Sequence, residues 1–221
     1  MKSKISPIIF TPDNEPYLGR ELLNCLDIQI ISALKQSSDI SSNYNDSTLD
    51  NYQCMANQVI SQSISLVLSI RELIRQGYLF GGHVLNRSLI ERVTILLYLH
   101  LHPEHIEKWD QGWVGGRGGG KAPSLGFMFT AIQKKLDRQP VVPGHELTNI
   151  LNSLVHGKPD SAPWNLVSLG GNKAVHAVSK ILQRPELCDE LCVNVIPQLC
   201  IISSMMTAYF PNSRPNHESA I

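Results

Sequence analysis

Apolar residues recur along this chain at the three- and four-residue spacing of amphipathic helices. The pattern predicts helices over residues 19–36, 47–77, 83–100, 125–137, 144–156, 172–183 and 185–210, with a short helix starting at Pro103. The segment 37–46 is rich in Ser, Asn and Asp, which favour turns and helix caps. We find no strand pair flanking a hairpin turn and no internal repeat. The predicted class is therefore all-α, a helical bundle.

Domain organisation follows from the same pattern. Residues 1–18 contain three prolines and little periodicity, which predicts an extended arm. We expect residues 1–46 to form an N-terminal arm with the first helix, and residues 47–221 to form the helical bundle domain. The chain of 221 residues suits one domain with such an appendage.

Composition narrows the possible partners. The 43% of apolar residues excludes disorder of the whole chain, and 19 basic residues balance 19 acidic ones. Nucleic acid therefore needs a local basic patch, since no global positive field exists. Charged residues make up only 17%, which favours surface buried in an oligomer.

Cysteine use and hydropathy predict a cytoplasmic protein without a membrane role. The five cysteines include no CxxC pair, which is typical of reduced thiols. The start of the chain has an apolar run too short for a secretory signal. The longest apolar stretch that we identify, Ile95 to Leu101, is interrupted by His100 and falls short of a membrane span.

A glycine-rich segment from Gly115 to Ala122 approaches the phosphate-binding pattern GxxxxGK[ST]. Ala122 replaces the Ser or Thr that would contact magnesium, and no strand precedes the segment. A P-loop is therefore not expected. Two interpretations remain: a flexible loop between helices, or an RNA-contacting loop that uses Arg117, Lys121 and the nearby Trp113.

The clustered histidines do not predict a metal site. His100, His102 and His105 do not share one helix face, and Pro103 lies between them. We expect neither a metal nor a cofactor.

A polar stripe crosses the most apolar predicted helix. His83, Arg87 and Glu91 stand four residues apart, so they share one face, and Arg87 can pair with Glu91. Buried charges are unfavourable unless they are paired or hydrogen-bonded. Two interpretations stay open: a buried ion pair that fixes helix register, or a cationic pocket with His83 as a further binding group.

A second group lies at the C-terminal end of a later helix. Asn152 and His156 share a helix face, and Gly157 and Lys158 follow directly. The helix dipole favours a cationic imidazole at this end. His156 is either a cap for the last carbonyl groups or a residue that contacts a ligand, together with Asn152 and Lys158.

These two groups carry a resemblance to a known family. The quoted residues are Asn86-Arg87-Ser88-Leu89-Ile90-Glu91, then Leu96-Leu97-Tyr98-Leu99, and later Leu154-Val155-His156-Gly157 with Pro159-Asp160. The pattern resembles uncharacterised bacterial all-α proteins related to the HEPN superfamily of helical bundles, over about residues 50 to 210. That resemblance implies a protein of a toxin–antitoxin, abortive-infection or phage-defence system.

The resemblance also implies roles for individual residues. Active HEPN ribonucleases carry an Arg, four to six residues and then a His, often with a polar residue after the Arg. Asn152 and His156 match the polar residue and the His, but Leu151 occupies the Arg position. The resemblance then implies His156 as acid/base, with Arg87 as the phosphate clamp from the neighbouring helix and Glu91 orienting it.

Three functions follow from these observations. The first is a HEPN-like module that binds RNA, nucleotide or a partner protein such as an antitoxin, without cleavage. The second is a metal-independent endoribonuclease toxin, and the third is a structural interaction protein. The last helix is apolar on more than one face, so we also expect a two-fold homodimer with Ile202 in its interface and His156 near the partner.

Overall fold

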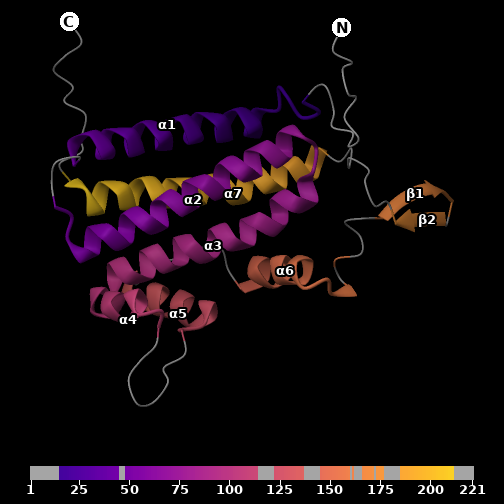
Figure 1. Cartoon of the computed structure of the whole chain (residues 1–221). Helices are drawn as coiled ribbons and strands as arrows, with labels where there is room; N and C mark the ends of the chain where they lie inside the picture. Colours follow the sequence, from indigo (N-terminus) through magenta and orange to yellow (C-terminus); the bar gives the residue numbers. More distant parts are fainter. Residues whose placement is uncertain are drawn as a thin grey trace, which may run out of the picture.

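The computed structural model describes residues 15–44, 48–113, 122–136, 145–159, 161, 166–171, 173–176 and 185–211. The helices are α1 (Glu21–Asn43), α2 (Asn51–Arg75), α3 (Leu79–Leu101), η1 (Pro103–His105), α4 (Ile106–Asp110), α5 (Leu125–Leu136), α6 (His145–Val155) and α7 (Pro185–Tyr209). The class is all-α, and the helices form a bundle, as the periodicity predicted (Figure 1).

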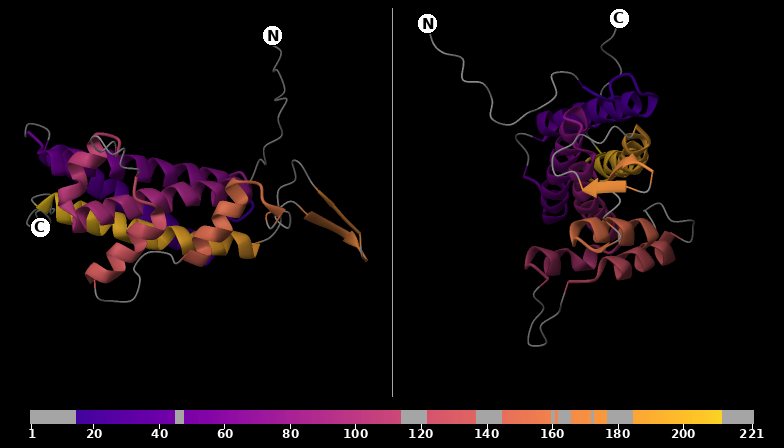
Figure 2. Two further views of the ribbon diagram at one scale, coloured as in Figure 1. Left: turned by 90° about the horizontal axis from the view of Figure 1, so that it is seen from below. Right: turned by 90° about the vertical axis from the view of Figure 1, so that its right-hand side faces the viewer.

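Helix α3 is the centre of the bundle. It contacts α2 and α7 on one side and α5 and α6 on the other, while α1 covers α7 from the far side (Figures 1 and 2). A helix with several neighbours must bury more than one face, which agrees with the twelve buried residues of α3, most of them apolar. The environment of each polar side chain on α3 therefore depends on which neighbouring helix packs against its position.

Helix α7 buries most of its large apolar side chains inside the same chain, although Val193 stays 52% exposed. It packs against α1, α2 and α3. Ile202, expected in a dimer interface, is 0% exposed within the bundle. The expectation is wrong for this residue, because three helices of the chain already surround α7. The homodimer itself stays a prediction that must use another surface.

Helix α7 also exceeds the apolar stretch that the sequence analysis identified as the longest. Among the described helices it is the one that is long and apolar enough to cross a membrane. Core helices of soluble proteins meet the same criterion, so length and composition assign α7 no membrane role.

Helix α1 extends beyond its predicted end and belongs to the bundle. It continues to Asn43 through the predicted turn, where the hydroxyls of Ser41 and Ser42 bond the carbonyls of Ser37 and Ser38 at 3.0 Å. Hydroxyls bonded to the preceding helical turn are compatible with a continuing helix. Among the described residues, α1 shares one hydrophobic core with the helices that follow it, on the other side of the expected boundary at 46/47.

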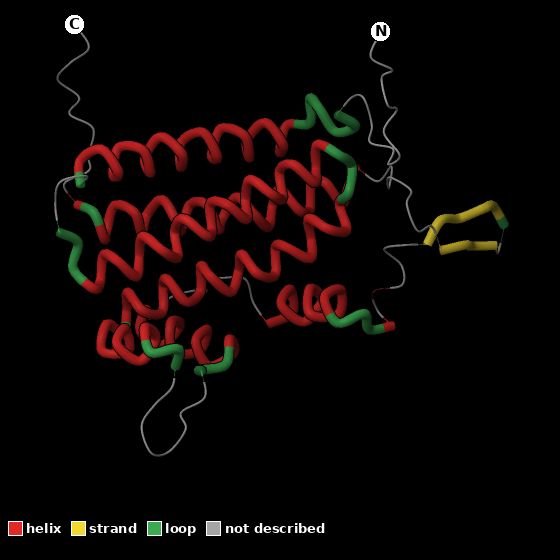
Figure 3. Tube along the Cα trace, viewed as in Figure 1, coloured by secondary structure: helices red, strands yellow, loops and turns green. Residues whose placement is uncertain are grey.

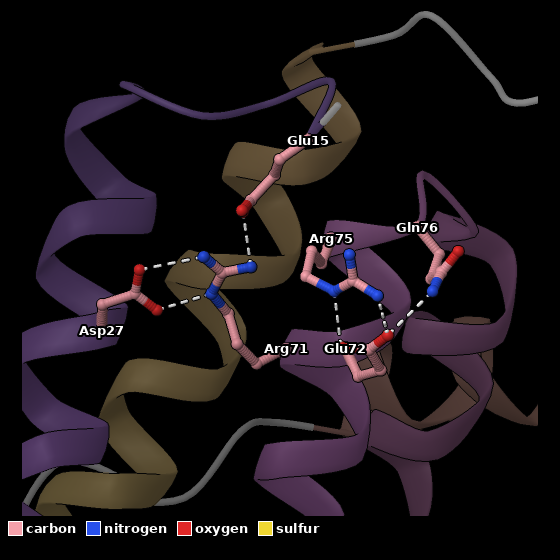
Figure 4. Close-up of polar contacts among 6 residues, drawn as sticks. All are labelled: Glu15, Asp27, Arg71, Glu72, Arg75 and Gln76. Carbon is pink, nitrogen blue, oxygen red and sulfur yellow. Dashed lines mark hydrogen bonds and ion pairs between the residues drawn. The ribbon is translucent and has the colours of Figure 1, made fainter. Parts of the chain in front are cut away.

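Ion pairs attach α1 and the residues before it to the bundle. Arg71 of α2 donates two hydrogen bonds to Asp27, at 2.5 and 3.0 Å, and contacts Glu15 at 2.6 Å (Figure 4). Figure 4 also shows the separate, exposed pair of Glu72 with Arg75. The two acidic partners raise the pKa of the Arg71 guanidinium above its usual value, mainly through the hydrogen bond to Asp27.

The boundary between α2 and α3 differs from the predicted one. Asp50 caps α2 and forms a capping box with Gln53, and α2 ends before Gly77, whose φ is +80°. Gly81 and Gly82, which lie between the predicted helices 47–77 and 83–100, belong to the first turns of α3. A Cβ on Gly82 would lie 2.6 Å from Cδ2 of Leu191, so this glycine allows α3 and α7 to approach closely.

A short β-hairpin is the main departure from the predicted elements. Strands β1 (Leu166–Gly170) and β2 (Lys173–His176) pair antiparallel beside the helices (Figure 3). The expected helix 172–183 is therefore wrong at Lys173–His176, while Asn172 and residues 177–184 lie outside the described part. Positive φ angles at Gly170 (+92°) and Gly171 (+58°) reverse the chain here, which suits glycine.

Candidate functional site

Helix packing brings three of the expected site residues together. Arg87, on α3, donates through Nε to Oδ1 of Asn152 on α6 at 2.7 Å, and through Nη1 to Oε2 of Glu91 at 3.2 Å. The Arg87 side chain is 17% exposed, whereas that of Glu91 is 49% exposed. The guanidinium is therefore fixed at the junction of α3 and α6, with part of it open to solvent.

The exposure of Glu91 argues against the first interpretation of the stripe, a buried ion pair. If the pair were fully buried, removing one partner would destabilise the protein by about 3–5 kcal/mol. A helical i, i+4 pair with an exposed partner contributes only about 0.3–0.5 kcal/mol. The pair is thus a weak contributor to stability.

Two further candidate residues, His156 and Lys158, follow directly after the end of α6. Lys158 N–H donates to the Ser153 carbonyl at 3.0 Å and His156 N–H to the Asn152 carbonyl at 3.0 Å. Gly157 adopts a φ of +59°, so these bonds close a Schellman-type cap. The cap uses backbone groups only, so it does not engage the side chains of His156 and Lys158. Both side chains are exposed and follow Asn152 by four and six residues.

Leu151 is 1% exposed and belongs to the core. The resemblance to HEPN ribonucleases would require an Arg at this position. An arginine here would need a buried partner or a rotated helix. The cation nearest to Asn152 comes instead from Arg87, on a different helix.

His83 does not belong to this site. Its ring is 1% exposed, and Nε2 lies 3.1 Å from the Leu187 carbonyl of α7. Burial lowers the pKa of His83 to about 4. The expectation that His83 binds a ligand is wrong, because α3 directs this end of the stripe toward α7 and into the core.

Most of the glycine-rich loop, residues 114–121, lies outside the described part of the chain. Arg117 and Lys121, both expected to bind phosphate, lie outside the described residues. Trp113, the last described residue before them, is partly buried against the core and has a φ of +61°. The RNA-contacting role of this loop stays a prediction.

The structure adds a basic and aromatic hollow that the sequence analysis missed. A hollow of about 460 Å³ lies along α5, lined by His102, Phe127, Thr130, Ala131, Lys134 and Lys135. Phe127 is 57% exposed and shares one face of α5 with Lys134, seven residues later. That spacing was the available signal, because i, i+3, i+4 and i+7 positions align on a helix. An exposed aromatic ring beside lysines suits a base with its phosphates.

The histidines at and after the C-terminal end of α3 are engaged in separate contacts. Tyr98 and His105 share a hydrogen bond at 2.6 Å, as do Tyr52 and His100, and His102 lies 3.2 Å from Glu104. In the described part of the chain, no three His, Cys, Asp or Glu side chains converge in a way that could hold a metal ion.

Comparison with known proteins leaves the family unassigned. No family model, curated protein or solved structure matches this chain. The geometry of the Arg87 site is therefore the basis for any functional conclusion.

Proposed function

We propose that this protein is a HEPN-like module that binds single-stranded RNA at the junction of α3 and α6 without cleaving it. The observation that carries the proposal is the partly exposed Arg87 side chain, held by Asn152 of α6, the helix after which the exposed His156 and Lys158 follow in the chain. A fixed guanidinium is well suited to a phosphate, because its orientation is set before binding.

Binding is favoured over catalysis by the position of Leu151. Cleavage at a phosphate needs a cation and an acid/base group placed together on the reacting atoms. Leu151 removes the cation from the helix that carries His156, and Glu91 already neutralises part of the Arg87 charge. The hollow along α5, with Phe127 and Lys134, adds a second surface for a base and its phosphates.

The biological setting is part of the same proposal. We place the protein in the cytoplasm, in a defence or toxin-type system, as a two-fold homodimer that binds an antitoxin-like partner. The resemblance in the Arg87 and His156 segments supports the setting, and the low share of charged residues supports an oligomer.

RNA binding is tested by fluorescence anisotropy with a labelled single-stranded oligoribonucleotide at several salt concentrations. Arg87→Gln should weaken binding roughly ten-fold, because a charge-assisted hydrogen bond is lost. It should also reduce the slope of log K against log salt by about 0.7, the value for one phosphate on a single strand.

Arg92→Gln is the matched control. Arg92 lies on the same helix but bonds Gln62 and the Ser88 carbonyl, away from the site. Equal losses in the Arg87 and Arg92 variants, or no RNA binding by the unmodified protein, would contradict the proposal.

Incubation of the same RNA with the protein and a chelator separates binding from cleavage. We expect intact RNA. Cleavage that is lost in His156→Ala would instead establish the ribonuclease alternative, with Arg87 as its phosphate clamp.

A further inference from the structure

A second hollow lies away from the Arg87 site, between α2 and the segment η1–α4. Its volume is about 400 Å³, within the range of about 300–1,000 Å³ that is typical of small-molecule sites. The first two turns of α2 form one wall and residues 103–110 form the other. Met55 and Ile106, both buried, supply an apolar floor.

Aromatic rings contribute to both walls of this hollow. Tyr52 comes from α2 and Trp109 from α4. The Tyr52 hydroxyl shares a hydrogen bond of 2.6 Å with Nδ1 of His100, and its ring lies 4.2 Å from that of Tyr209. These contacts fix the Tyr52 ring, so one aromatic wall is rigid before any ligand arrives.

The charge of the hollow is negative. Glu107 and Asp110, three residues apart on the short helix α4, line it, and its lining includes no Lys, Arg or His. Behind the wall, burial raises the pKa of Tyr52 and lowers that of His100, so both are neutral at pH 7. No positive charge of the lining therefore opposes a cation.

We propose that this hollow binds a small aliphatic ammonium ion of diamine size. The carboxylates of Glu107 and Asp110 attract the ammonium group, and an aromatic face such as that of Trp109 stabilises it by a cation–π contact. The apolar floor takes up the methylene chain of the ligand. An anion of the same length would meet two like charges and is excluded.

Isothermal titration calorimetry with cadaverine and with glutarate tests the charge preference. The two ligands have equal carbon chains and opposite charges. We expect saturable cadaverine binding that weakens with added salt, and no glutarate binding. Absence of saturable cadaverine binding at about 10 mM, or equal binding of glutarate, overturns the proposal.

Substitutions locate the site. Glu107→Gln, Asp110→Asn and Trp109→Leu should each weaken cadaverine binding roughly three-fold or more. Glu104→Gln is the control, because Glu104 is an exposed acid of the same segment that does not line the hollow. Unchanged binding in all three variants, or an equal loss in the control, places the ligand elsewhere and refutes the assignment.

A substitution that adds a positive charge at an exposed position tests the site without removing a residue of its walls. Gln58 is exposed on α2 and lines the hollow. Gln58→Lys places an ammonium group of the protein itself beside the carboxylates and should abolish cadaverine binding. Full binding by a folded Gln58→Lys variant, with an unchanged circular dichroism spectrum, would contradict the proposal.

Discussion

Replacing Gln198 by methionine is expected to stabilise this protein. Gln198 lies on α7 and is 0% exposed, and neither Nε2 nor Oε1 of its side chain has a hydrogen-bond partner among the described residues. Asn86 on α3, the neighbouring helix, has the same property. Folding therefore transfers two amides from water into the core without a hydrogen-bond partner among the described residues.

The magnitude follows from the cost of that transfer. A buried polar group without a partner destabilises a protein by about 1–3 kcal/mol. Methionine has a similar length and no polar group, so Gln198→Met should increase the free energy of unfolding by about that amount. For a chain of this size, each kcal/mol raises Tm by about 2–4 °C.

Gln36→Met is the matched control. The Gln36 amide donates to the Ser203 carbonyl and to the Thr207 hydroxyl, each at 3.0 Å. The same chemical change there removes two hydrogen bonds between α1 and α7. We expect a loss of about 1 kcal/mol, so the two substitutions should have opposite signs.

Urea denaturation followed by circular dichroism measures both variants. A fall of about 1 kcal/mol or more in Gln198→Met would refute the reasoning, since it would show that the amide is hydrogen-bonded in solution. Asn86→Leu then distinguishes the cause. If Asn86 and Gln198 share a bonded group, the double variant will be more stable than the sum of the single changes predicts.

Three further predictions follow from the core and its helix ends. Gly82→Ala should lower the free energy of unfolding by about 1–3 kcal/mol in urea melts, because the new methyl group would meet Leu191, which cannot move freely in the core. Gly81→Ala is the control and should be neutral or stabilising, because its methyl group meets the less confined Leu73 side chain at 3.2 Å. Equal effects of the two substitutions would argue against a close approach of α3 and α7 at Gly82. Because burial lowers the folded-state pKa of His83 to about 4, the unfolded chain binds the extra proton between about pH 6.5 and pH 4, so stability falls as pH falls through this window, by up to about 3 kcal/mol. The dependence of unfolding free energy on pH in this window should be smaller in His83→Gln. If thermal melts at several pH values show the same dependence in the variant, other groups cause it. Asp50→Ala should lower Tm by the equivalent of about 1 kcal/mol through loss of the capping box, and an unchanged Tm in calorimetry would show that the cap is dispensable.

The long helices were predictable because their signal is local. Periodic apolar residues in 51–75 and 185–209 repeat over many turns, and a buried stripe at helical spacing has few alternatives. The end of α1 was missed because serine is read as a turn residue, whereas Ser41 and Ser42 bond the preceding turn. The hairpin 166–176 was missed because its short strands give a weak period, and its turn glycines also precede a residue that suits a helix cap.

The candidate site was only partly predictable. Arg87, Glu91, Asn152 and His156 could be chosen from their spacing on two helices. The 2.7 Å contact between Arg87 and Asn152 joins residues that are 65 positions apart, which no local pattern encodes. The hollow lined by Tyr52 and Trp109 likewise combines two distant segments.

By itself the sequence determined the cores of the long helices and which of their faces are apolar, because both depend mainly on neighbours within a few residues, whereas Lys173–His176, expected to be helical, forms a strand. Tertiary structure alone decided what each face meets. His83 and Arg87 lie one turn apart on α3, yet α7 buries the first and α6 leaves the second partly open. Ile202 reads as an interface residue in sequence, but packing against three helices of its own chain makes it core. Burial is a property of all neighbours in space, and most of those neighbours are remote in the chain.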